Sequence, residues 1–154
     1  MKKIFVLITG LTPFLIGYGL NLMIINLGVI LTIVLDMIGV VFFLYWGLLG
    51  FKFSKFTSSK VYTLVIFHLP ALLVLLLVLF QELINKQYWN NYLGITTQFF
   101  YLPTIIVSSK IMQIFSMHEM WKSYILSFAL MIAVFYLGCY IRDRGEMTKE
   151  QDRI

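Results

Sequence analysis

A long apolar run near the N-terminus contains one charged residue, and this combination limits what the chain can fold into. The run extends from Leu27 to Phe51, and Asp36 is its only charge. As a helix it would measure about 37 Å, enough to cross a hydrocarbon core about 30 Å thick. A carboxylate inside that core is costly unless it is protonated, paired or in contact with water. The run therefore predicts a membrane-spanning helix with a polar site inside it.

The helical face around Asp36 predicts where that side chain points. Counted inward from Leu27, Asp36 is expected near mid-depth of the bilayer. The residues that share its face are small or polar: Gly28, Thr32, Gly39, Gly47 and Gly50. The opposite face carries aliphatic side chains suited to lipid: Ile30, Val34, Val41 and Leu48. Because small residues let a second backbone approach closely, we expect Asp36 and its four glycines to lie at a helix–helix interface.

The composition is that of a multi-spanning membrane protein. Of the 154 residues, 60% are hydrophobic and 12% are charged, and the mean hydropathy is +0.90. In such a chain a net charge of +5 indicates orientation in a bilayer rather than binding to nucleic acid, because Lys and Arg gather in cytoplasmic loops. Scarce alanine with abundant Ile, Phe, Lys and Asn is typical of an AT-rich bacterial genome. We expect a single transmembrane domain in a bacterial plasma membrane.

Four segments are predicted to span the bilayer. The apolar stretch from Ile4 to Phe51 would measure about 72 Å as one helix, so it must form two spans, with a turn expected at Asn21–Asn26. Pro13 lacks a backbone donor and is expected to kink the first span, which leaves the Thr9 carbonyl free. The predicted spans are residues 4–22, 27–51, 61–81 and 123–141, followed by a charged cytoplasmic tail at 142–154.

The segment between the last two spans, residues 93–121, is ambiguous. Its most apolar part, Phe99–Val107, is too short to cross a bilayer and contains Pro103. With four spans and both termini cytoplasmic, nine of the 12 Lys and Arg residues lie inside. A fifth span through this segment lowers that number to seven. The positive-inside rule therefore favours four spans with a re-entrant or interfacial segment over the alternative of five transmembrane helices.

Three intramembrane polar residues are functional candidates: Asp36, His68 and Thr12. Asp36 is either a carboxylate that handles protons or cations, or a protonated side chain that bonds to a neighbouring helix. In the second case Thr12, or the Thr9 carbonyl, is the expected acceptor at matching depth. His68 lies roughly 12 Å nearer the cytoplasmic face, so a direct pair with Asp36 is not expected. A neutral His68 bonded to the backbone near Pro70 is favoured.

No catalytic or metal-binding pattern emerges from the sequence. His118-Glu119 begins like the H-E-x-x-H motif of zinc proteases, but Lys122 stands where the second histidine is required. The single cysteine, Cys139, excludes an internal disulfide and is expected to be a small packing residue. No cofactor is expected.

Three classes of function stay open. The favoured class is a non-enzymatic accessory, regulatory or protective membrane subunit that associates with itself or with another membrane protein. The second is a small oligomeric transporter or channel that uses Asp36, since four spans make a thin pathway in one protomer. The third is a membrane enzyme acting on lipid, with residues 93–121 as its site. The glycine-lined face and the missing catalytic set favour the first class.

Overall fold

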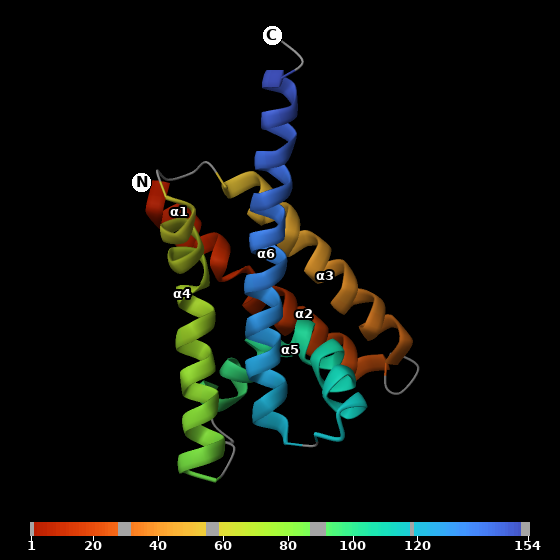
Figure 1. Cartoon of the computed structure of the whole chain (residues 1–154). Coiled ribbons are helices and arrows are strands. Elements are labelled where there is room, and N and C mark those ends of the chain that lie inside the picture. Colours follow the sequence, from red (N-terminus) through yellow and green to blue (C-terminus); the bar gives the residue numbers. More distant parts are fainter. Residues whose placement is uncertain (1, 28–31, 55–58, 87–91, 118, 152–154) are drawn as a thin grey trace.

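The computed structural model is an all-helical bundle (Figure 1). It describes residues 2–27, 32–54, 59–86, 92–117 and 119–151, and these contain no strand. In chain order the helices are α1 (Lys2–Gly10), α2 (Thr12–Leu27), α3 (Thr32–Phe53), α4 (Lys60–Leu79), the π-helical turn η2 (Phe80–Ile84), α5 (Tyr92–Ile114) and α6 (Met120–Gln151). The predicted all-α class is confirmed.

Four helical segments are long and apolar enough to cross a membrane. They are Ile4–Asn26, Val34–Phe53, Lys60–Ile84 and Met120–Gly145. Their number agrees with the prediction from the sequence. On α3, Val34, Val41 and Leu48 are exposed, as expected for a face turned to lipid. Because so many large apolar side chains lie on the outside, the surface of the bundle is suited to hydrocarbon rather than to water.

The first predicted span is divided into two helices. The α-helical pattern is interrupted at Leu11, and Phe14 N–H donates to the Leu11 carbonyl across the break (3.1 Å). Pro13 is the second residue of α2, where a missing backbone N–H removes no helical hydrogen bond. The expected disturbance is therefore present, but it lies before Pro13, where a new helix begins.

The turn predicted at Asn21–Asn26 is wrong. These residues continue α2, which ends at Leu27. Asn26 Nδ2 donates to the Leu22 carbonyl one turn back (2.7 Å), so the polar side chain is satisfied by the helix itself. The connection to α3 falls in residues 28–31, outside the described residues.

The basic segments of the chain gather at one end of the bundle. Arg142 Nη1 on α6 donates to the Phe51 and Lys52 carbonyls at the end of α3, over 3.0 and 3.1 Å. Lys60, at the start of α4, forms an ion pair with Asp143. Figure 1 shows α1 beginning at this end, while α6 continues beyond it. The residues after Ile141 are helical to Gln151.

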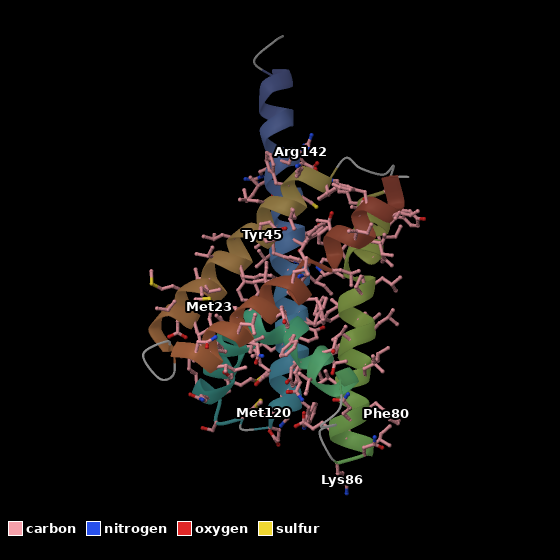
Figure 2. The ribbon with its side chains drawn as sticks, turned by 180° about the vertical axis from the view of Figure 1, so that it is seen from behind. Met23, Tyr45, Phe80, Lys86, Met120 and Arg142 are labelled. Atoms are coloured by element: carbon pink, nitrogen blue, oxygen red, sulfur yellow. The ribbon has the colours of Figure 1, made fainter. Side chains whose placement is uncertain are left out.

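Helix α5 enters the bundle from the other end and returns toward it (Figure 1). Figure 2 places Lys86, after η2, and Met120, at the start of α6, at this same end, opposite Arg142. Between them α5 packs against α2, α3, α4 and α6. Pro103 lies inside α5, and α5 is not one of the four segments with the length and hydropathy of a span. The sequence prediction that residues 93–121 differ from the spans agrees with this arrangement.

The interior has two regions of different chemistry. One, the aromatic half, lies toward Arg142 and contains packed rings from α3, α4 and α6: Phe42, Trp46, Phe53, Phe67 and Phe135. The other, the hydroxyl half, lies toward Lys86 and contains buried polar side chains from α5, α6 and η2: Gln81, Thr97, Thr104, Ser108, Ser123 and Ser127. The candidate site lies in the hydroxyl half.

Candidate functional site along helix α5

One face of α5 carries a row of buried polar side chains. Thr97, Tyr101, Thr104 and Ser108 follow each other at intervals of four, three and four residues, which places them on one side of a helix. All four are buried. None of these four residues is a candidate from the sequence analysis. Their helical spacing was the signal that identifies them as an inward face.

The row is bonded to α6 through two serines. Ser108 Oγ donates to the Thr104 carbonyl (3.1 Å), and it lies 2.7 Å from Ser127 Oγ. Because the Ser108 proton is directed to its own helix, Ser127 is the donor between the two hydroxyls. Both residues are fully buried. This bond holds α5 against the first half of α6.

Two further bonds fix α5 against α4 and η2. Tyr101 donates its hydroxyl to the Ala71 carbonyl over 2.7 Å. Gln81 Nε2 donates to Thr97 Oγ1 over 3.4 Å, while Gln81 Oε1 is buried without a partner among the described residues. Neither Gln81 nor Tyr101 was a candidate from the sequence. Each has a long polar side chain that bonds to a neighbouring helix.

The bend of α5 is packed against α2. Pro103 has no N–H to donate to the Phe99 carbonyl one turn before it. Gly17 on α2 lies directly on this carbonyl, since a Cβ at Gly17 would stand 1.8 Å from Phe99 O. A Cα–H group is a weak donor to such an oxygen. Glycine at position 17 therefore lets α2 cover the free carbonyl that Pro103 creates.

Asp36 forms an ion pair with Lys110 near the end of α5. The two side chains are 32% and 53% exposed, respectively, and Asp36 Oδ1 is buried without a partner in the described part of the chain. The structure thus gives Asp36 a cationic partner on α5 in place of the expected acceptor on the first span. Lys110 is not among the candidates from the sequence.

Asp36 lies near the start of α3 rather than deep inside an apolar helix. It is the third residue of the described apolar segment Val34–Phe53. The depth was counted from Leu27, but Leu27 ends α2 and α3 begins at Thr32 in the described residues. An ion pair near the end of a span is less costly than one at the centre, because polar head groups and water are close.

Thr12 and His68 each have a partner other than Asp36. Thr12 Oγ1 donates to the Thr9 carbonyl (2.9 Å), so the carbonyl expected to be free is occupied. His68 Nδ1 lies 2.9 Å from the Leu64 carbonyl, and His68 Nε2 accepts from Trp46 Nε1 over 3.1 Å. These two bonds define a neutral ring with its proton on Nδ1. The expected backbone bond is present, and Trp46 is the partner that the sequence did not reveal.

The glycines predicted for helix packing lie at contacts with α5 and α6. A Cβ at Gly39 would stand 2.7 Å from a Val107 methyl, and one at Gly50 would stand 2.1 Å from Phe135 O. Gly47 faces Val134 on α6, with 3.2 Å to its methyl. Gly28 lies outside the described residues. The first contact joins α3 to the site helix, and the others join α3 to α6.

The remaining sequence candidates add no chemistry to this site. His118 lies outside the described residues, and Glu119 pairs with Lys122 over 2.8 Å. Cys139 is buried and its Sγ donates to the Gly50 carbonyl (3.2 Å). Among the described residues, no three His, Cys, Asp or Glu side chains form a group that holds a metal.

The polar row, the ion pair and Gln81 together form a site whose bonds join α5 to α3, α4, η2 and α6. Such bonds are suited to holding an irregular helix inside a membrane bundle, where its polar groups must find partners within the protein. No protein-family model matches this chain, and comparisons with curated proteins and with solved structures gave no match.

Proposed function

We propose that the chain is an integral membrane protein of the bacterial plasma membrane, with four spans, a re-entrant α5 and both termini in the cytoplasm. The four long apolar segments support insertion. The start of α1, the end of α3, the start of α4 and Arg142 on α6 carry Lys or Arg residues and lie at one end of the bundle, as the positive-inside rule requires of a cytoplasmic end. The polar face of α5 is covered by other helices, which is the condition for a re-entrant helix at membrane depth.

Reporter fusions test this topology. A reporter placed after Ser116 is expected on the outer side, and one placed after Arg144 is expected in the cytoplasm. If both reporters lie on the same side, α5 crosses the bilayer and the four-span topology is wrong. Resistance of the chain to alkaline extraction from membranes tests insertion independently of orientation.

Within this topology we propose a non-enzymatic accessory, regulatory or protective subunit that associates with itself or with another membrane protein. The observation that supports this proposal is that the row of polar side chains on α5 ends against packed aromatic rings. The polar face of α5 reaches the aromatic half, where rings such as Trp46 and Phe135 pack in contact with His68. Because α5 enters and returns at the same end of the bundle, its polar side chains do not form a continuous polar pathway from one end of a protomer to the other. This supports a structural role for their hydrogen bonds.

Purification in a mild detergent followed by native mass measurement tests the association. We expect a defined oligomer of this chain or a stoichiometric complex with a second membrane protein. A monomer that carries no partner at membrane concentrations would contradict the proposal. The same measurement after solubilisation in a harsher detergent gives the control, because a specific assembly should dissociate into whole subunits.

A transporter or channel built from several copies is the second candidate, and the Asp36–Lys110 pair is the observation that favours it. This pair joins α3 to α5, and one oxygen of Asp36 is buried without a partner in the described residues. A carboxylate of this kind is suited to proton or cation binding. In liposomes, proton or cation flux that is lost in Asp36→Asn but kept in Ser109→Ala would support transport. Absence of flux in the unaltered protein would contradict it.

A further inference from the structure

The chain presents apolar side chains on the outside of the bundle where α5 ends and α6 begins. Ile114 is 78% exposed, Phe115 66%, Met117 42% and Met120 48%. We call these four residues the apolar tip. Large apolar side chains that gather in one short exposed stretch mark a surface that contacts something other than water.

The apolar tip lies short of the end of the bundle. Figure 1 shows the helix of α4 and η2 continuing past the connection between α5 and α6, and Figure 2 places Lys86 beyond Met120. Leu83 and Ile84, in the last turn of that helix, are 48% and 68% exposed and belong to the apolar segment Lys60–Ile84. The apolar surface of the bundle therefore extends farther than the tip. In the proposed insertion, the tip is level with the border between hydrocarbon and head groups.

The backbone at the apolar tip has its own hydrogen bonds. Ser116 has a left-handed conformation (φ 55°), and its N–H donates to the Gln113 carbonyl over 3.0 Å. Met117 N–H donates to the Met112 carbonyl over 3.0 Å, which completes the pattern of a Schellman motif. Phe115 N–H also donates to the Met112 carbonyl (3.1 Å). Because three successive N–H groups are bonded within the chain, this helix end can lie where water is scarce.

The first turn of α6 has the side chains of a membrane–water border. Lys122 Nζ lies 5.4 Å from the centre of the Trp121 ring. Lys122 also pairs with Glu119 over 2.8 Å, so each of these two charges has a counter-charge beside the tip. Trp and Lys next to an apolar surface are typical of segments that are anchored in the interfacial layer.

We propose that the apolar tip is inserted into the interfacial layer of the outer leaflet, with Ile114 and Phe115 in contact with lipid acyl chains. The partner of this surface is the lipid of the surrounding membrane, and the contact anchors the returning end of α5 at a fixed depth. The anchor depends on the proposed insertion and orientation. It goes beyond them, because insertion of the four spans leaves a connection on the outer side free to lie in water.

Spin-label accessibility in vesicles of phosphatidylethanolamine and phosphatidylglycerol tests the anchor. The whole chain carries Cys139→Ser, and single labels are attached to Phe115→Cys at the tip, Asn85→Cys after η2 and Leu44→Cys on the exposed face of α3. Collisions with oxygen, which dissolves in lipid, and with a water-soluble nickel complex report the depth of each label. We expect the label at position 115 about 5–10 Å inside the interface, the label at position 44 deeper, and the label at position 85 in water.

The same three labels separate failure of the anchor from failure of the proposed insertion. If the label at position 115 is as accessible to nickel as the label at position 85, while position 44 is in lipid, the anchor is wrong and the insertion stands. Low collision rates with both reagents and broadening between labels at position 115 would show that a second copy of the chain covers the tip, which also overturns the anchor. A label at position 44 in water would overturn the insertion and the anchor together.

A second set of variants tests whether the apolar side chains set this depth. Replacing both residues by Ile114→Ser and Phe115→Ser should shift a label on Met117→Cys toward water, with more nickel collisions and fewer oxygen collisions. Gln113→Ser, at an exposed polar position on the same turn, is the control and should leave that label unchanged. An unchanged label in the double variant would show that packing of α5 in the bundle alone fixes the depth, and the anchor would be wrong.

Discussion

The aromatic half and the hydroxyl half of the interior are held together by different kinds of contact. In the aromatic half, rings contact rings, with 4.5 Å between the centroids of Phe67 and Phe135 and 5.4 Å between those of Phe42 and Trp46. In the hydroxyl half, the helices are joined in addition by hydrogen bonds between side chains or from a side chain to a backbone carbonyl, such as those of Ser127 and Tyr101. The difference follows from the helix that each half must hold. Long apolar helices meet in the first, whereas the second holds α5, whose hydroxyls need partners inside the protein.

This comparison predicts that close packing in the aromatic half contributes more to stability than single hydrogen bonds in the hydroxyl half. Hydrogen bonds between membrane helices have modest energies because alternative partners exist in the unfolded state. Close contacts between two helix backbones cannot be replaced in this way. A methyl group added to a glycine at such a contact must push the neighbouring helix away. The variants below test this order, from the largest expected effect to the smallest.

The largest effect is expected from Gly138→Ala at the crossing of α3 and α6. The new Cβ would stand 2.0 Å from the Gly47 carbonyl oxygen and 2.8 Å from the Phe51 nitrogen, so two backbones must separate. We expect the free energy of unfolding to fall by more than about 3 kcal/mol. Unfolding by SDS in mixed micelles measures the change. Gly19→Ala, which would meet nothing within 4 Å, is the control and should cause no loss.

Trp46→Phe is expected to have the next largest effect. It keeps an aromatic ring in the core but leaves His68 Nε2 buried without its donor. An unsatisfied buried acceptor costs about 1–3 kcal/mol. Adding His68→Leu removes the unsatisfied atom, so the double variant should lose less stability than the sum of the two single variants. Strictly additive losses would show that the bond contributes nothing of its own.

The Asp36–Lys110 pair is expected to contribute less, because both side chains are partly exposed. A double-mutant cycle with Asp36→Asn and Lys110→Met should give a coupling free energy of about 1 kcal/mol or less. The coupling should decrease with added salt, since the pair is accessible to counter-ions. A coupling well above that of Trp46 and His68 would reverse the comparison between the two halves.

The smallest effect is expected from Ser127→Ala, which removes one hydroxyl of the Ser108–Ser127 bond. Bonds of this kind between membrane helices average about 0.6 kcal/mol. Ser109→Ala is the matched control, because the Ser109 hydroxyl donates to the Ile106 carbonyl of its own helix and, within the described residues, bonds to no other helix. If Ser127→Ala is as damaging as Gly138→Ala, the hydroxyl half is the structural centre of the molecule and the comparison fails.

The sequence predicted the four long apolar helices well and the junctions between them poorly. Spans are defined by the sum of hydropathy over about 20 residues, which local context hardly alters. Turns between apolar helices depend on a few residues. In the segment Asn21–Asn26, which continues α2, the Asn26 side chain donates to a carbonyl of its own helix, so this polar residue does not require a turn. The error at this turn also displaced the predicted depth of Asp36.

The sequence by itself determined an apolar, all-helical chain with four long segments, a distinct segment near residue 100, and the glycine face of α3. These properties follow from composition and from the helical period, which act locally. Only the tertiary structure decided that Lys110 pairs with Asp36, that Trp46 donates to His68, and that Gln81 keeps a buried oxygen without a donor among the described residues. Each of these three observations depends on side chains that come from different helices. Their distances depend on how the helices cross, which no local pattern in the sequence specifies.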